Sequence, residues 1–247
     1  ILAIMNYCEN NLIRFYSVPH VRNYIKRQLQ LELLGEVPVL SIRTEPLQNP
    51  VNRLAKRLFD LTFSSLFLLT IFPFMYLIVG LIIKITSPGP IFFKQERNGE
   101  NGKIFKCYKF RSMKVNALSD SLQATKNDPR KTRFGNFLRK SNLDELPQFI
   151  NVFKGEMSIV GPRPHMLKHT EEYSQLINKY MMRHLVKPGI TGWAQVTGYR
   201  GETKELSQME GRVRRDLWYI ENWTFLLDIR IMIKTVTNMF RGEKNAY

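Results

Sequence analysis

The sequence is short of cysteine and of acidic residues. Its 247 residues include only two cysteines, Cys8 and Cys107, and these form no CxxC pair. Two distant cysteines exclude a zinc site built from cysteine ligands and are typical of free thiols in a reducing compartment. The GxxxxGK[ST] pattern of phosphate-binding loops and the HExxH pattern of zinc peptidases are also missing. Acidic residues are outnumbered, because 21 Asp and Glu stand against 37 Lys and Arg and leave a formal net charge of +16.

The positive charge is concentrated between residues 51 and 140. This segment carries 17 Lys and Arg against 5 Asp and Glu, a net charge of +12. Such a concentration indicates an anionic partner, which could be nucleic acid, lipid headgroups or a phosphorylated substrate. No stretch has the pattern of a nucleic-acid module with clustered aromatics, so we expect no nucleic acid partner.

Residues 1–50 are expected to be the tail of an upstream domain, with a proline-bounded linker at its end. Residues 12–16 and 37–42 have strand character, and residues 21–34 have helical spacing. These elements are too few to build a core of their own. Because the first residue is Ile1, we expect the sequence to be a fragment of a longer chain.

An uncharged run, residues 61–83, is the most apolar part of the chain. A helix of this length can cross the hydrocarbon core of a bilayer at about 1.5 Å per residue. Pro73 lies in its middle, where proline removes a backbone hydrogen bond and bends a helix. Both flanks are basic, and the positive-inside tendency would place both in the cytoplasm. We therefore favour a re-entrant hairpin bent at Pro73, with a straight spanning helix as the alternative.

The segment after this run predicts a cationic β-hairpin. Residues 91–97 and 103–113 have strand character, and residues 98–102 form a turn signal. Five cations are expected to lie on one face, where they would meet headgroups or phosphate; a solvated face is the alternative. They are Lys103, Lys106, Lys109, Arg111 and Lys114.

Two adjacent carboxylates, Asp144 and Glu145, follow the basic segment at the end of a predicted helix or helix pair over residues 132–146. A carboxylate is a good nucleophile or Mg²⁺ ligand when the substrate is a phosphate. Arg163 follows between Pro162 and Pro164, which restrict its backbone, and its planar fork suits phosphate oxygens. The sequence therefore predicts phosphoryl transfer around Asp144 at a membrane surface.

The remainder of the chain is less specific. Residues 187–201 form a glycine-punctuated loop and strand with Lys187 and Arg200 near its ends, consistent with phosphate binding or with turns alone. His165 and His169 are better explained by a solvated helix face than by a metal site.

A short helix that Gly155 closes is predicted over residues 149–155, and further helices over residues 171–182, 209–218 and 223–239. Four aromatic residues near the last two helices are expected to lie at a membrane interface. They are Trp218, Tyr219, Trp223 and Phe225.

Six short motifs, in this order, resemble the bacterial sugar transferases that prime glycan synthesis, the monotopic polyprenyl-phosphate phosphoglycosyl transferases. The resemblance runs from about Arg53 to the C-terminus, and residues 1–47 resemble the end of the degenerate nucleotide-binding-like domain of larger members. Glu156 departs from the family, which more often has Asp there. The motifs are residues 56–60, 87–90, 109–113, 144–148, 161–164 and 187–192.

The resemblance implies a reaction, in which a sugar 1-phosphate passes from a UDP-sugar to undecaprenyl (polyprenyl) phosphate with release of UMP. This step would begin exopolysaccharide, capsule or O-antigen synthesis. Asp144 would be the nucleophile that forms a covalent aspartyl phosphosugar, and also a ligand of the cofactor Mg²⁺. Glu145 would orient or deprotonate the acceptor, or act in a second shell around the metal. The candidates for binding substrate phosphate are Arg97, Lys109, Arg111, Arg163, Lys187 and Arg200.

The resemblance also implies an α/β fold of the α+β type at the bacterial inner membrane. A re-entrant membrane helix, residues 51–86, would lead into a compact catalytic domain, residues 87–247. That domain would have amphipathic interfacial helices and a small sheet, contact membrane lipids and face the cytoplasm.

Two other functions are compatible with parts of this pattern. A non-catalytic basic membrane protein would explain the charge but neither the acidic pair nor the Pro-Arg-Pro turn. A conventional glycosyltransferase would release UDP instead of UMP. The donor sugar stays open between glucose, galactose and N-acetylated sugars, the glycan pathway is open, and so is the choice between monomer and homodimer.

Overall fold

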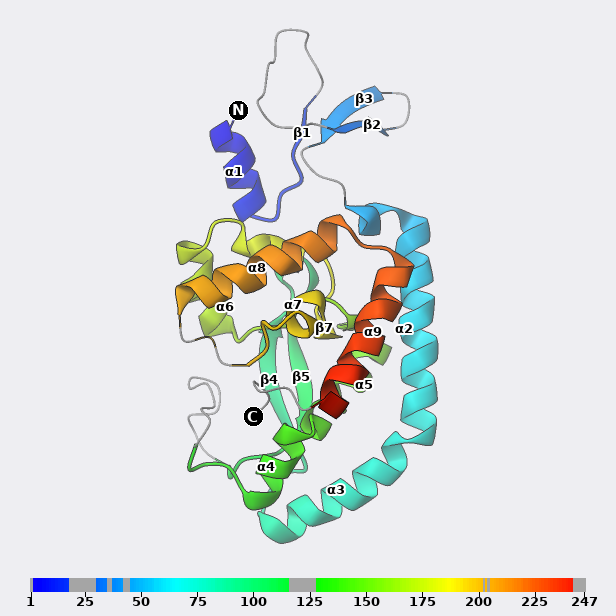
Figure 1. The fold of residues 1–247 in the computed structure, drawn as a ribbon, viewed down its shortest axis with the longest axis vertical. Coiled ribbons are helices and arrows are strands. Elements are labelled where there is room, and N and C mark those ends of the chain that lie inside the picture. The colour runs from blue at the N-terminus through cyan, green and yellow to red at the C-terminus, as the bar shows by residue number, and fades with distance from the viewer. Residues whose placement is uncertain are drawn as a thin grey trace.

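The computed structural model describes residues 2–17, 30–34, 37–41, 45–115, 128–201, 203 and 205–241. Mixed helices and small sheets make up this part of the chain, as the α/β expectation requires (Figure 1). The N-terminal elements lie at one end of the view. They are helix α1 (Leu2–Asn10) and strands β1 (Tyr16–Ser17), β2 (Gln30–Leu34) and β3 (Val37–Ser41), in the order β1-β3-β2.

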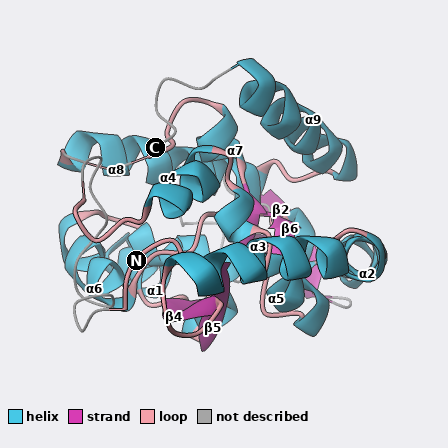
Figure 2. Ribbon diagram, turned by 90° about the horizontal axis from the view of Figure 1, so that it is seen from below, coloured by secondary structure: helices cyan, strands magenta, loops and turns pink. Residues whose placement is uncertain are grey.

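Two long helices run along one side of the molecule. Helix α2 (Pro50–Thr70) and helix α3 (Phe72–Thr86) are separated only by Ile71 and bent by 56°. Pro73 occupies the first turn of α3, so the predicted bend at this proline is confirmed. Figure 2 shows α2 nearly end-on while α3 crosses the view.

By length and composition, neither helix alone could cross a bilayer, nor could any other helix in the described part of the chain; the bent α2–α3 pair taken together meets those criteria.

Strands β4 (Phe92–Asn98) and β5 (Ile104–Phe110) form the predicted hairpin around the 3-10 turn η2 (Glu100–Gly102). The expected single cationic face is wrong. Lys106 and Lys109 are three residues apart, so they face opposite sides of a strand; Lys106 is exposed and Lys109 is half-buried. Arg111 is buried.

The segment that bears the acidic pair is confirmed as two short helical pieces. Helix α4 (Arg133–Lys140) precedes the 3-10 turn η3 (Leu143–Glu145), and α5 (Gln148–Lys154) follows. Gly155 ends α5 with a left-handed φ of 83°, as the sequence predicts.

The last part of the chain surrounds a two-stranded parallel sheet. Gly161, after β6, and Gly189, in β7, touch backbone to backbone, since a Cβ on Gly189 would lie 2.1 Å from the Gly161 nitrogen. The elements are β6 (Ser158–Val160), α6 (Leu167–Leu176), η4 (Tyr180–Leu185), β7 (Gly189–Thr191), α7 (Trp193–Val196), α8 (Leu206–Glu221) and α9 (Phe225–Arg241).

Aromatic side chains attach the two long helices to the rest of the protein. Phe67 of α2 packs against Phe149 of α5, with ring centroids 4.2 Å apart. Phe72 of α3 lies against Phe92 and Phe110 of the hairpin, at 6.4 and 6.2 Å. The opposite faces of α2 and α3 leave large apolar side chains exposed, among them Leu54, Leu58, Leu66, Leu69, Phe74, Leu77, Ile78, Leu81 and Ile85.

A buried polar cluster joins α2 to β6, α8 and α9. Lys56 Nζ lies 2.6 Å from Asp228 Oδ2 and 3.0 Å from the Val160 carbonyl oxygen. Tyr219 and Trp223 also donate to Asp228, at 2.8 and 3.1 Å. Because Val160 ends β6, this cluster fixes the start of the Pro-Arg-Pro turn.

Several local predictions are wrong. Of the predicted strand 12–16, only Tyr16 is in a strand. Residues 30–34, expected to be helical, pair antiparallel with β3, while residues 18–29 lie outside the described part. The predicted helix 171–182 breaks after Leu176, because Lys179 takes a left-handed φ of 66°.

Of the four aromatic residues expected at a membrane interface, two are buried, so the prediction is wrong for those two. Tyr219 and Trp223 are buried, since both donate to Asp228 inside the protein. Trp218 and Phe225 are exposed, each at 41%.

We predict that Lys56→Met destabilises the folded protein by about 3–5 kcal/mol, because it leaves the buried Asp228 carboxylate without the cation that pairs with it. Thermal unfolding in detergent measures this. Arg53→Met is the matched control: the Arg53–Glu100 pair is exposed, so the change should cost less than about 1 kcal/mol. Equal losses in the two variants would contradict the role assigned to Lys56.

Candidate functional site

The two adjacent carboxylates are buried at a sharp change of chain direction. Helix α4 ends at Lys140, and Asn142 then adopts a left-handed φ of 58°, a conformation that asparagine tolerates better than most residues. The turn η3 follows at once, and Asp144 and Glu145 are 7% and 8% exposed. The predicted pair therefore lies inside the protein, where ionised groups need partners.

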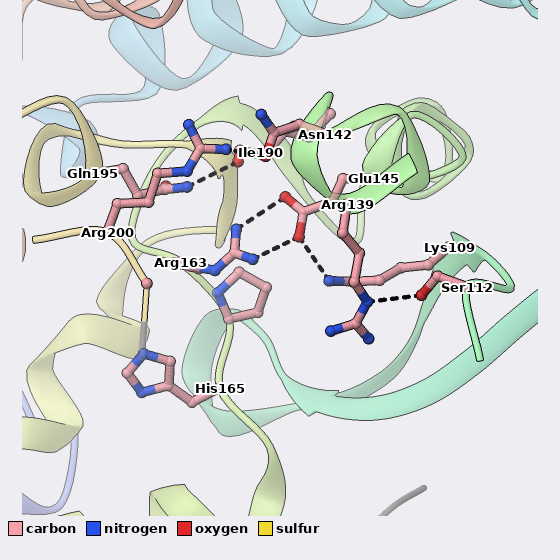
Figure 3. Close-up of polar contacts among 12 residues, drawn as sticks. Lys109, Ser112, Arg139, Asn142, Glu145, Arg163, His165, Ile190, Gln195 and Arg200 are labelled. Carbon is pink, nitrogen blue, oxygen red and sulfur yellow. Dashed lines mark hydrogen bonds and ion pairs between the residues drawn. The ribbon is translucent and has the colours of Figure 1, made fainter. Parts of the chain in front are cut away.

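Glu145 has such partners on two other elements. Arg163, in the turn after β6, donates from Nη1 to Oε2 at 3.0 Å and from Nη2 to Oε1 at 2.5 Å. Lys109, on β5, donates to Oε1 at 2.7 Å. Figure 3 shows the guanidinium fork of Arg163 and the Lys109 ammonium converging on this carboxylate. The structure thus brings three of the predicted site residues together.

These cations decide the charge state of Glu145. Burial alone would raise its pKa, but the charges of Arg163 and Lys109 hold the pKa of Glu145 well below its ordinary value. Glu145 in turn raises the pKa of Arg163. One carboxylate therefore meets two basic side chains in this group.

Asp144 is in the opposite situation. Burial, together with the neighbouring negative charge of Glu145, raises its pKa to about 6 against the opposing effects of Lys109, Arg139 and Arg163. Within the described part of the chain, no hydrogen bond or ion pair engages its carboxylate. Two carboxylates in one site therefore differ: one is neutralised by cations, and the other is left for chemistry as a nucleophile, a base or a metal ligand.

The raised pKa also has a thermodynamic consequence. The folded chain holds the Asp144 proton more tightly than the unfolded chain, whose ordinary value is 3.8. Ionising Asp144 therefore reduces stability as the pH rises from about 4 through about 6. A group that costs stability in its charged form is typical of a functional site.

Two further arginines lie near the pair: Arg139, which was not among the candidates from the sequence, and Arg200, which was. Arg139 Nε donates to the Ser112 hydroxyl at 2.8 Å. The predicted Arg200 donates to the side-chain oxygen of Asn142, above the Glu145–Arg163 pair in Figure 3. In the sequence, Arg139 is one of several basic residues of the amphipathic helix α4. Its positive charge was therefore the only feature that could have indicated a place in the site.

Three other predicted phosphate-binding residues have different surroundings. Arg111 donates to the main-chain oxygens of Ser87 and Pro88, at 2.5 and 2.8 Å. Arg97 donates to the Pro164 oxygen at 3.2 Å. Burial lowers the pKa of Lys187, whose charged neighbours are Glu100, Arg57, Asp60 and Arg53. A role of these three in binding phosphate stays a prediction.

His165 is not on a solvated helix face, so that prediction is wrong. It precedes α6 and is buried, with Nδ1 2.7 Å from the Tyr180 hydroxyl and 2.9 Å from Arg183 Nη1. His169 lies within α6 and is half-buried. In the part of the chain that the structure describes, no group of three or more His, Cys, Asp or Glu side chains is placed to hold a metal ion.

The sequence is similar to one protein family and to several known proteins. The sequence model of one family, described as bacterial sugar transferase, matches residues 51–242. A relative from Escherichia coli (strain K12), named UDP-glucose:undecaprenyl-phosphate glucose-1-phosphate transferase, is 52% identical over 233 residues, which are 93% of this chain and 49% of the relative. The chain spans about half the length of this relative and of a similarly named Xanthomonas campestris relative.

Two further relatives differ in length and in name. The exopolysaccharide production protein PSS of Rhizobium leguminosarum is 45% identical over 194 residues, 76% of this chain and 96% of the relative. A protein from Aeromonas hydrophila, named UDP-N-acetylgalactosamine-undecaprenyl-phosphate N-acetylgalactosaminephosphotransferase, is 35% identical over 231 residues, 92% of this chain and 54% of the relative.

We predict that the side-chain carboxyl of Asp144 titrates with a midpoint near pH 6, and that Glu145→Gln lowers this midpoint, because the variant removes the adjacent negative charge and frees two cations. NMR titration of ¹³C-labelled aspartate measures both values. Glu210→Gln is the control: it removes an exposed acid on α8 and should leave the midpoint of the Asp144 titration unchanged. A wild-type midpoint near 4 would contradict the assignment.

Proposed function

This chain belongs to the bacterial sugar transferase family, and on that premise we propose that it transfers a sugar 1-phosphate from a UDP-sugar to undecaprenyl phosphate, releasing UMP. The observation that carries this proposal is the difference in environment between the two adjacent carboxylates. Glu145 is neutralised by Arg163 and Lys109, whereas Asp144 has no hydrogen-bonding partner among the described residues. An unengaged buried carboxylate beside paired cations suits attack on a phosphate.

In the first step, the Asp144 carboxylate attacks the β-phosphorus of the UDP-sugar. A bond forms between the Asp144 oxygen and this phosphorus, and the bond from phosphorus to the bridging oxygen breaks. UMP leaves with that electron pair, and the sugar 1-phosphate remains on Asp144. Arg163 and Lys109 retain N–H groups that Glu145 does not use, and these would bind the phosphate oxygens.

In the second step, a phosphate oxygen of undecaprenyl phosphate attacks the same phosphorus. The new phosphorus–oxygen bond gives the lipid diphosphate sugar, and cleavage of the Asp144 bond regenerates the carboxylate. The second pKa of a phosphate monoester is about 6, so the acceptor is largely ionised at neutral pH and needs no strong base. The low pKa of Glu145 supports a holding role for this residue rather than one as a general base.

Magnesium fits this site as a cofactor. Mg²⁺ is commonly held by one or two carboxylates together with substrate phosphates and water, and Asp144 supplies one unengaged carboxylate. When bound, the ion would offset the repulsion between the diphosphate and the acidic pair. Asp144 is the residue that we assign as its protein ligand.

We further propose that the α2–α3 pair is a re-entrant hairpin in the cytoplasmic leaflet of the inner membrane, so that the catalytic residues face the cytoplasm. Three observations support this: the 56° bend, the exposed apolar faces of both helices, and the basic residues at both ends. The acceptor would then reach the site from within the bilayer.

Glucose is the donor sugar that the relatives support best. The relatives at 52% and 48% identity are named for UDP-glucose, and the one at 35% is named for UDP-N-acetylgalactosamine. We therefore propose UDP-glucose as the donor.

We predict that purified protein, with Mg²⁺ and undecaprenyl phosphate in nanodiscs, releases UMP from UDP-glucose, and that Asp144→Asn abolishes both release and the covalent adduct. The amide lacks the charge and nucleophilicity of the carboxylate. Intact-protein mass spectrometry detects the adduct, and chromatography separates UMP from UDP.

The exposed Glu210→Gln is the control and should keep full activity. Release of UDP would move the chain to conventional glycosyl transfer. An adduct that persists on the Asp144→Asn variant would disprove the assigned nucleophile.

We also predict that EDTA stops UMP release and that Mg²⁺ restores it, because the diphosphate then lacks its compensating charge. Unchanged release in excess EDTA would show that the cations of the protein suffice.

A further inference from the structure

A buried ionic cluster lies directly behind the Pro-Arg-Pro turn. Its centre is Arg183 of η4, whose side chain is 1% exposed and pairs with Asp216 of α8, 2% exposed, at 2.7 Å. Arg183 and Asp216 are not among the charged neighbours that shift the pKa of Asp144 or of Glu145. The proposed reaction gives them no step.

Arg183 uses three directions of its planar group at once. Nε donates to Asp216 Oδ2, Nη1 lies 2.9 Å from His165 Nδ1, and Nη2 donates to the main-chain oxygen of Arg163 at 2.8 Å. Since arginine is always a donor, His165 Nδ1 must be the acceptor in this contact. The planar fork therefore connects α8, His165 and the backbone of Arg163 in one rigid arrangement.

His165 is kept neutral, as this contact requires. Burial, with the nearby charges of Arg183 and Arg212, holds the pKa of His165 well below its ordinary value. The Tyr180 hydroxyl lies 2.7 Å from the same nitrogen, Nδ1, and Arg212 Nη1 lies 3.4 Å from Nε2 on the other side of the ring. His165 thus serves as a permanent acceptor for Arg183.

The contact with the Arg163 carbonyl adds a hydrogen bond to a backbone that the flanking prolines already restrict. Pro162 and Pro164 restrict their own backbone angles, and Arg163 lies between them. The hydrogen bond from Arg183 holds the peptide plane that follows the Arg163 Cα, and hence the direction in which its guanidinium leaves the chain. That guanidinium must meet Glu145 with two hydrogen bonds at once.

We propose that Arg183, held by Asp216 and His165, is a positioning residue for Arg163. It aims the Arg163 guanidinium at Glu145 and, on the basis of the proposed function, at the phosphates of the donor. A lysine cannot replace it, because an ammonium lacks the three-way planar geometry.

A double-mutant cycle with Arg163 tests this inference. We expect Arg183→Lys to lower kcat/KM for UMP release by about 10–100-fold, the usual effect of losing a residue that orients an active group. In the Arg163→Lys background the same change should cost less than about 3-fold, because no aligned guanidinium remains to misplace. If the loss of kcat/KM in the double variant equals the product of the losses in the two single variants, the two residues act independently and the proposal is overturned.

Arg130→Lys is the matched control, since Arg130 also pairs with an aspartate, Asp128, at 2.6 Å but has no contact with the turn. It should retain activity within about 2-fold. If Arg183→Lys does not fold, His165→Phe removes the acceptor for Arg183 Nη1 while keeping the Arg183–Asp216 pair, and its loss of activity should likewise disappear in the Arg163→Lys background.

A second measurement needs no substrate and so separates failure of this inference from failure of the proposed function. In the wild type, the clamped Arg163 guanidinium should give resolved, slowly exchanging ¹⁵N-bound proton signals. Arg183→Lys should merge them, and Arg130→Lys should not. Unchanged Arg163 signals in folded Arg183→Lys protein would overturn the positioning role whatever the reaction.

Discussion

The site depends on one electrostatic constraint: two adjacent buried carboxylates cannot both be ionised without compensation. The chain resolves this by neutralising only Glu145. Its two cations come from elements far apart in sequence, Lys109 from β5 and Arg163 from the turn after β6. The hairpin and the parallel β6–β7 pair are therefore the parts of the fold that the site requires, and the remaining helices hold these two in register.

The same principle of buried, fully paired charge recurs in the framework. Lys56 joins the long helix α2 to Asp228 and to the end of β6, and Arg183 joins α8 to the turn that follows β6. Both clusters thus end at the backbone on either side of the Gly161-Pro162 segment. Each cluster thereby contacts the main chain of the segment that carries Arg163.

The sequence predicted the parts that depend on local pattern. Pro73 marked the bend, Gly155 the end of α5, and the acidic pair and Arg163 stood out because their residue types suit phosphate. It did not reveal Arg183, Asp216 or the buried state of His165, because a buried ion pair looks like two surface charges until the fold brings them together, here 33 residues apart. The strand β2 was missed for a similar reason, since pairing with β3 outweighs local helical spacing.

The contact between Gly161 and Gly189 has a consequence for recombining this protein with its relatives. A Cβ on Gly161 would lie 2.5 Å from the Lys187 oxygen and one on Gly189 would lie 2.1 Å from the Gly161 nitrogen, so strand β6 with its turn and strand β7 with its loop fit as a pair. A chimera whose crossover falls between residues 164 and 187 joins halves that were shaped separately, and it tolerates this only where both partners bring glycine. Chimeras with relatives are therefore best made by exchanging residues 158–192 as one block, or by leaving that block intact.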